Sequence, residues 1–193
     1  MNKLNKIALA LTAALTLGMN ATTASAGSLA GQLNTQMVLQ ASCIISGAPG
    51  AGSSGVNMGT LDFGTQPSTF TGAVNATSTG SAGGAGATQI LCSPDIASLA
   101  VTVGAGNNAG QGASIGTGAR AMKLGTSSYL PYEVYSDAAH TSAYPTSATP
   151  VGITMPGTGA AIGLPIYGRI NKTSANAITS GTYSDVLQVT LSW

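Results

Sequence analysis

The sequence feature that most constrains the fold is a two-residue alternation that runs from Leu29 to Cys43. Apolar or small side chains occupy nearly every odd position, and polar side chains such as Gln32 and Gln36 occupy most even positions. A period of two is the signature of a β-strand with one buried face. The run covers about fifteen residues, more than twice the length of a usual strand. We therefore predict two strands in series, of which the second belongs to this domain and the first serves another.

A secretory signal precedes this alternating segment. Lys3 and Lys6 supply a positive start, residues 7–17 form a short apolar run, and residues 24–26 match the small-x-small cleavage pattern. The alternative, a membrane anchor, is disfavoured because a spanning helix needs roughly 20 apolar residues. We predict a signal peptide over residues 1–26, a mature chain that starts at Gly27, and no membrane insertion.

The chain is poor in charge, which limits the partners that it can bind. Charged residues make up 6% of the sequence, against about 25% in an average soluble domain. Such a surface repels neighbouring copies weakly and therefore suits self-association. It also lacks the clustered Lys and Arg residues that nucleic acids and anionic membranes require. Nucleic acid is not an expected partner.

The two cysteines of the chain are Cys43 and Cys92. In an exported chain, an even number of cysteines predicts a disulfide, and two free thiols are the alternative. Each cysteine shares the apolar parity of its own strand pattern, Cys43 with Ala41 and Cys92 with Ile90. We therefore expect the bridge to be buried.

The rest of the chain has the pattern of an all-β domain. Apolar residues alternate in four further stretches, which are residues 99–103, 130–134, 162–170 and 187–193. Clusters of Gly, Pro, Ser and Asn separate them, as turns require. No window keeps a helical period, so we predict one sandwich of two sheets. Three Gly-rich stretches are expected to be connecting loops: residues 47–55, 80–86 and 104–118.

The last strand pattern ends with the sequence itself, so we expect a sandwich that lacks one strand. Such a sandwich exposes an apolar groove and an unpaired edge. A free strand from a neighbouring copy can fill this groove. The exchange joins two different surfaces, so it would produce a linear polymer and not a closed ring.

A set of short motifs in fixed order carries a resemblance to one family. They include Gly-Thr-Leu-Asp-Phe-Gly at residues 59–64, Tyr-Glu-Val-Tyr-Ser-Asp-Ala at 132–138 and Leu-Pro-Ile-Tyr-Gly at 164–168, with the cysteine contexts at 42–43 and 91–92 and Gly-Thr-Tyr-Ser-Asp at 181–185. The chain resembles pilins of the archaic chaperone–usher pathway, in the spore coat protein U domain family. It is similar to the Csu-type major rod subunits. The ordered set, with the cysteine spacing, is specific although each motif alone is weak.

The resemblance implies an all-β fold, an incomplete immunoglobulin-like β-sandwich completed by donor-strand complementation. A periplasmic chaperone lends a strand during export, and an outer-membrane usher exchanges it for the leader strand of the next pilin subunit. The pilin domain would span residues 38–193, and the family disulfide maps onto Cys43 and Cys92. The product would be an extracellular pilus, a linear homopolymer used for attachment and biofilm formation. This chain has a donor strand and no room for an additional receptor-binding domain, so the resemblance favours a rod subunit over a tip adhesin.

The resemblance also assigns the residues of donor and acceptor. The donor strand maps onto residues 27–37. On its apolar face, Leu29, Leu33 and Met37 would be the large side chains that plug the groove, and the smaller residues Gly31 and Thr35 would meet shallow places in it. The acceptor groove would be bordered by the domain's first strand, residues 38–45, and by the closing strand, residues 185–193. The groove face of the closing strand would present Leu187, Val189, Leu191 and Trp193.

Catalysis and cofactor binding have little support in the sequence. His140 is the only histidine, and Asp137 near it is better explained by a polar turn, because no nucleophile motif accompanies the pair. Asp62 and Asp185 stand in turn-like contexts and are expected to hold turns. One histidine and two paired cysteines provide no metal site. We therefore predict no enzyme activity, no cofactor and no metal.

The alternative function is a monomeric secreted carbohydrate-binding β-sandwich. Six tyrosines could provide stacking platforms for sugars. However, Tyr132 shares the apolar parity of its strand and Tyr183 opens the last strand pattern, so most tyrosines are expected in the core or in subunit contacts. The structural subunit is the preferred interpretation.

Overall fold

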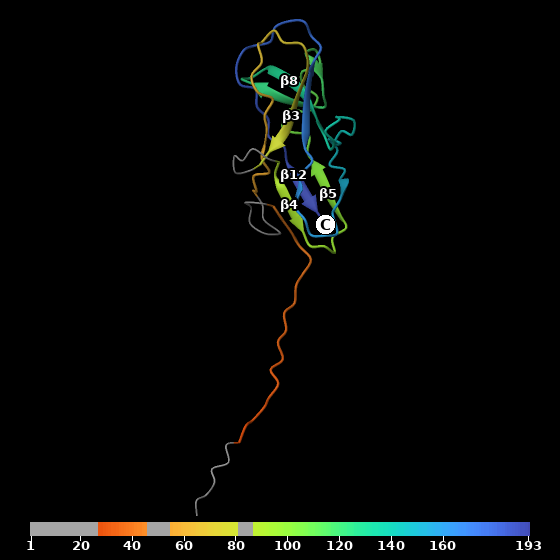
Figure 1. The fold of residues 1–193 in the computed structure, drawn as a ribbon. Coiled ribbons are helices and arrows are strands. Elements are labelled where there is room, and N and C mark those ends of the chain that lie inside the picture. Colours follow the sequence, from red (N-terminus) through yellow and green to blue (C-terminus); the bar gives the residue numbers. More distant parts are fainter. Residues whose placement is uncertain (1–26, 46–54, 81–86) are drawn as a thin grey trace, which may run out of the picture. The chain divides into compact units, whose positions relative to one another are not determined.

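The computed structural model describes residues 27–45, 55–80 and 87–193, and all regular structure within them is β (Figure 1). The predicted signal peptide and most of the predicted loops 47–55 and 80–86 lie outside the described residues. The chain divides into two units, Met1–Val38 and Leu39–Trp193. Within the described part, no helix is long and apolar enough to cross a membrane. The prediction of an all-β fold is confirmed.

The strands of the described residues form three antiparallel sheets. The first has the order β1-β4-β10, the second β2-β3-β11-β8-β7 with β6 beside β11, and the third β12-β5-β9. The strand bounds in chain order are β1 Cys43–Ile45, β2 Thr60–Leu61, β3 Gly72–Thr79, β4 Gln89–Cys92, β5 Ser98–Val103, β6 Gly116–Thr117, β7 Arg120–Leu124, β8 Ser128–Tyr135, β9 Val151–Thr154, β10 Ile162–Gly163, β11 Tyr167–Lys172 and β12 Val189–Ser192.

One hydrophobic core joins the three sheets. Alternate residues of β5 and β8 point into it, as the sequence pattern predicts, because a strand turns successive side chains to opposite faces. Ile90 of β4 and Ile170 of β11 complete it from the other strands. The buried residues on the core face of β5 and β8 are Leu99, Val101, Val103, Leu130, Tyr132 and Val134, and Pro131 on the other face of β8 is buried as well.

The stretch 162–170, predicted as one strand, is two strands in two different sheets. Strand β10 pairs with β4, whereas β11 pairs with β3 and β8. Pro165 lies between them and has no backbone N–H to donate to a ladder. Ile166 N donates instead to Leu164 O over 2.9 Å. The chain therefore changes sheet at this proline while its alternation continues.

The alternating segment 29–43, predicted as two strands in series, forms a strand only at its C-terminal end. Strand β1 begins at Cys43, so the first domain strand predicted over residues 38–45 is shorter than expected, and residues 27–42 have no regular structure. The side chains of Leu29, Leu33 and Met37 are exposed. A strand exists only where its backbone groups pair with a neighbour. Within a single copy, the apolar face of this segment is therefore neither paired as a strand nor buried.

Strands β2, β3, β6, β7 and β9 lie outside the stretches predicted from the sequence, and β6 stands in residues 104–118, which were expected to form a loop. The two longest of them, β3 and β7, carry little apolar alternation. Strand β3 pairs with β11 over six residues, yet the side chains that it buries are only Ala76 and Ser78. Strand β7 opens with the fully buried Arg120. Small, polar and charged residues at buried positions hide a strand from any pattern based on hydrophobicity.

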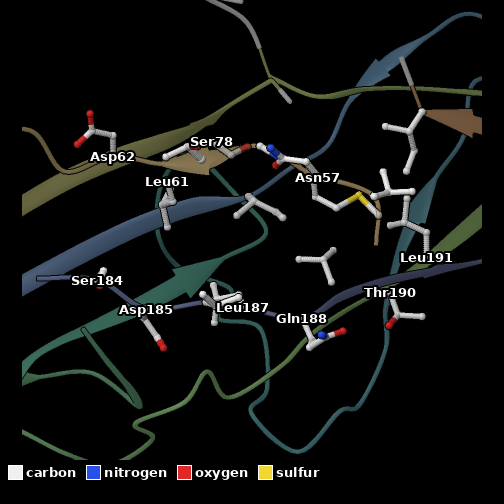
Figure 2. Close-up of a pocket in the computed structure, with 18 of the residues that line it drawn as sticks. Asn57, Leu61, Asp62, Ser78, Ser184, Asp185, Leu187, Gln188, Thr190 and Leu191 are labelled. Atoms are coloured by element: carbon white, nitrogen blue, oxygen red, sulfur yellow. The ribbon is translucent and has the colours of Figure 1, made fainter. Parts of the chain in front are cut away.

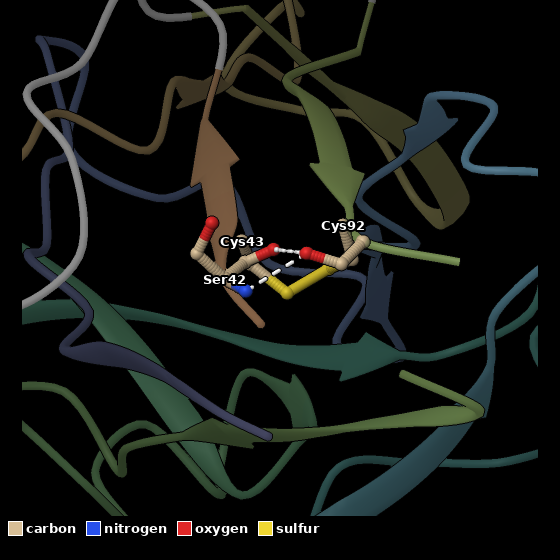
Figure 3. Close-up of a disulfide and its surroundings, with 4 residues drawn as sticks. Ser42, Cys43 and Cys92 are labelled. Carbon is tan, nitrogen blue, oxygen red and sulfur yellow. Dashed lines mark hydrogen bonds between the residues drawn. A yellow bond between two sulfur atoms is a disulfide. The ribbon is translucent and has the colours of Figure 1, made fainter. Parts of the chain in front are cut away.

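The predicted disulfide joins Cys43 of β1 to Cys92 of β4 (Figure 3). The two cysteines are register partners and both are buried, so free thiols are excluded. Beside the bridge, Ser42 N donates to Ser93 Oγ over 2.9 Å, and Ser93 Oγ donates to Ser42 O over 3.1 Å. The start of the domain is therefore held by one covalent bond and by hydrogen bonds between the Ser42 backbone and the Ser93 hydroxyl.

Loss of this bridge is expected to be costly. Its cysteines are 49 residues apart in the sequence, and closing a loop of that size stabilises a fold by about 4 kcal/mol through the unfolded state. We expect Cys43→Ser to lower the free energy of unfolding of the full chain by this amount in a urea titration. Reduced wild-type protein should show the same loss. An unchanged urea midpoint in the variant would contradict the prediction.

Candidate functional site

An open groove of about 980 Å³ runs along the domain (Figure 2). One wall is the segment 183–191, which includes most of β12, and the other is the segment 55–63, which includes β2. Figure 2 shows Leu61 and Asn57 on one side and Leu187 and Gln188 on the other. Buried core residues supply more of the lining, among them Cys43, Ser78, Tyr132 and Ile166.

The C-terminal wall keeps the alternation that the sequence predicts. Odd-numbered side chains from Tyr183 to Leu191 are half-buried, whereas the even-numbered ones between them are exposed. The structure places all four predicted groove-face residues in the lining: Leu187, Val189, Leu191 and Trp193. Trp193 is the most open of them, with 48% of its surface exposed. Their role as acceptor residues stays a prediction.

The opposite wall is also apolar and only half-buried. Met58, Leu61 and Phe63 pack against the core but remain partly open. Gly168 of β11 allows their approach, since a Cβ atom at this position would lie 2.6 Å from Leu61 Cδ2 and 2.7 Å from Phe63 Cζ. Apolar side chains left half-open on two facing walls form a surface that favours association.

Unpaired strand edges border this groove. Strand β12 is an edge of its sheet and pairs with β5, β1 is an edge and pairs with β4, and β2 is an edge and pairs with β3, within the described residues. An exposed edge presents backbone N–H and C=O groups that can pair with an added strand. The arrangement can therefore take up an extended peptide with apolar side chains at alternate positions.

Asp185 ties the C-terminal wall to the core. Its Oδ2 accepts a hydrogen bond from the Tyr132 hydroxyl over 2.9 Å, and its Oδ1 accepts one from Asn107 N over 2.9 Å. Burial, reinforced by the Asp185 charge, raises the pKa of Tyr132 far above its usual value, so the phenol remains a donor. The expectation that Asp185 holds a local turn is wrong.

Asp62 does hold a turn, as expected, because its Oδ1 accepts a hydrogen bond from Gly64 N over 2.8 Å. Gly64 has φ +69°, a backbone conformation that glycine adopts without strain. The turn ends the β2 wall next to Phe63. Of the two aspartates, one therefore shapes the local chain and the other makes a tertiary contact.

A buried ion pair that the sequence analysis missed supports the same wall. Arg120 is fully buried and pairs with Glu133. Its Nε donates to Gly104 O over 2.8 Å and its Nη2 donates to Val103 O over 3.0 Å. Gly104 N in turn donates to Gln188 O over 2.8 Å. The guanidinium thus fixes the end of β5, against which the C-terminal wall is paired.

The Asp137–His140 segment is a turn and not a catalytic pair. The Asp137 carboxylate accepts hydrogen bonds from the hydroxyl and the backbone N of Thr141, and the hydroxyl contact holds the pKa of Asp137 below its ordinary value. The ring of His140 lies instead near Tyr135 and Tyr167, at centroid distances of 5.2 and 6.3 Å. The expectation of a polar turn is confirmed.

Two of the six tyrosines lie in the core. Tyr132 is buried, as its parity predicts, and Tyr144 is buried as well. Burial raises the pKa of Tyr144 to about 12, and its hydroxyl donates to Pro165 O over 3.0 Å. Both side chains belong to the core and are closed to sugars.

Comparison with known proteins identifies the family. A family profile described as the Spore Coat Protein U domain matches residues 29–190. The chain therefore belongs to this family, and the resemblance found in the sequence is confirmed. Among curated proteins, no sequence matches this chain.

One similar solved structure is the CsuC–CsuE chaperone–tip adhesion subunit pre-assembly complex, from archaic chaperone–usher Csu pili of Acinetobacter baumannii. The sequence identity is 17%, the TM-score is 0.41, and the match covers 80% of this chain. The present chain spans 40% of the matched chain. At this identity and TM-score, the likeness by itself identifies neither a function nor a partner.

Proposed function

We propose that this protein is a structural, non-enzymatic subunit of an archaic chaperone–usher pilus rod and polymerises by donor-strand exchange. One observation carries the proposal: the domain has an apolar groove between unpaired strand edges, and the same chain has an unpaired segment with alternating apolar side chains. Residues 27–37 of one copy would fill the groove of the next copy. Membership of the spore coat protein U family supports this reading.

The donor segment has apolar side chains to bury. Leu29 is 101% exposed, Leu33 is 88% exposed and Met37 is 81% exposed. Transfer of each from water to an apolar site is worth about 2 kcal/mol, and each new ladder hydrogen bond adds about 1 kcal/mol. Ordering the segment opposes this by at least about 1 kcal/mol per residue. A long fibre lifetime would therefore rest mainly on a high barrier to dissociation.

The proposal implies three kinds of partner. A periplasmic chaperone would cover the groove before assembly, an outer-membrane usher would direct the exchange, and identical or related pilins would form the fibre. An open apolar groove is a liability for a free subunit, because exposed edges and patches promote aggregation. The assembled product would be an extracellular fibre for attachment and biofilm formation.

Deletion of residues 28–37 tests this function. The shortened chain should keep its fold and its chaperone complex but form no heat-resistant ladder on a gel of exported protein. The wild-type chain, expressed with the same chaperone and usher, should form the ladder. A monomeric carbohydrate-binding domain would give one band from both chains. A full ladder from the shortened chain would refute the proposal.

A further inference from the structure

The groove contains a buried hydroxyl group without a hydrogen-bond partner. Ser78 of β3 is 4% exposed and lines the groove, and its Oγ makes no hydrogen bond within the described residues. The register partner of Ser78 is Leu61, which stands on the wall of the groove (Figure 2). A buried hydroxyl in this state is destabilising, and native structures rarely leave one unsatisfied. Because Ser78 lines the groove, the groove's occupant is a candidate source of the missing partner.

The apolar face of the segment 27–37 carries one such group. Thr35 shares the parity of Leu29, Leu33 and Met37, and the remaining member of this face is Gly31. Thr35 thus places a hydroxyl among the side chains that would enter the groove. A hydroxyl both donates and accepts a hydrogen bond, so the single hydroxyl of Thr35 can pair with the single unpaired hydroxyl of Ser78.

We propose that Thr35 of a neighbouring copy hydrogen-bonds Ser78 and fixes the register of the inserted strand. This inference rests on the proposed function. Parity alone allows the donor to shift by two residues, which would set Leu33 or Met37 against the Ser78 hydroxyl and bury Thr35 without a partner. The register that sets Thr35 against Ser78 satisfies both hydroxyls. A single buried polar pair is a known means of selecting one register among apolar alternatives.

A disulfide trap tests the placement. A chain with Thr35→Cys and Ser78→Cys should form a covalent ladder on a non-reducing gel after boiling in denaturant, because the donor of one copy meets the groove of the next. The native cysteines are already paired with each other. The matched controls combine Ser78→Cys with Leu33→Cys or with Met37→Cys and should form no covalent ladder. A covalent ladder from either control, without one from the Thr35→Cys chain, would overturn the register.

A double-mutant cycle tests the hydrogen bond itself. Thr35→Val keeps the side-chain shape and removes the hydroxyl, so fibres of this variant should dissociate in denaturant about tenfold faster, the scale of one buried hydrogen bond. In a Ser78→Ala background, the same change should leave the rate unchanged or slow it. An equal effect in both backgrounds would overturn the bond. If fibres form but show neither the covalent ladder of the Thr35→Cys, Ser78→Cys chain nor an energetic coupling between Thr35 and Ser78, this register is refuted. Donor-strand exchange would still account for the fibres.

Discussion

Fibres of a Leu33→Asp variant are expected not to grow. Leu33 is the central plug of the proposed donor segment and is fully available to a neighbouring copy. Aspartate at this position would place a charge among the apolar side chains of a groove that already contains Asp62 and Asp185, and a buried charge without a partner is strongly unfavourable. The substitution lies outside the packed domain, so the domain's own stability should not change. The measurement is the heat-resistant ladder of exported protein.

Gln32→Asp is the matched control for this variant. Gln32 stands on the opposite parity of the same segment and is exposed, so the same charge would point away from the groove. Fibres of the control should assemble as in the wild type, with the same ladder. Normal fibres from Leu33→Asp would remove Leu33 from the donor face. Loss of fibres in both variants would show a general sensitivity of the segment to charge.

Removal of the buried guanidinium is expected to be strongly destabilising. Arg120→Met should lower the free energy of unfolding by about 3–5 kcal/mol, because breaking a buried ion pair leaves the other charge uncompensated. Glu133 would lose its partner, and the carbonyl oxygens of Val103 and Gly104 would lose their donors. Urea unfolding of the full chain measures the loss.

Arg169→Met separates this effect from a general loss of charge. Arg169 is only half-buried, and its Nε donates to Asn75 Oδ1 over 3.0 Å at the surface. Its removal should change the free energy of unfolding by about 0.5 kcal/mol or less, as for most surface substitutions. Equal losses from the two variants would mean that the ion pair does not support the domain. Because Gly104 adjoins the groove wall, fibres of Arg120→Met should also release subunits faster.

The parity of the core strands was predictable from the sequence for a simple reason. In β5 and β8, large apolar residues alternate with smaller or polar ones, and a strand has room for one buried face on such a pattern. The burial of Leu99, Val101 and Val103 follows directly. The same reasoning anticipated the alternation of Leu187, Val189 and Leu191 along the groove wall.

Residues whose role depends on distant partners could not be found in this way. Arg120 and Ser78 have no pattern in their neighbourhood that marks them as buried. Arg120 is buried because carbonyl groups of β5 and a carboxylate of β8 converge on it, and these contacts join segments far apart in sequence. Asp185 was misread for the same reason, since its partners are Tyr132 and Asn107 and not its chain neighbours.

The amino-acid sequence alone indicated the all-β character of this protein, favoured a bridge between its two cysteines and carried the resemblance to its family, because periodicity and ordered motifs are local properties that can be read without coordinates. Only the tertiary structure decided that the half-buried faces of residues 55–63 and 183–191 enclose a common groove. It also decided that residues 27–42 are not a strand in a single copy. The physical reason is that a strand needs a neighbouring backbone to pair with, and a groove needs two facing segments. The linear pattern shows which face of a segment is apolar but not which distant segment packs against it.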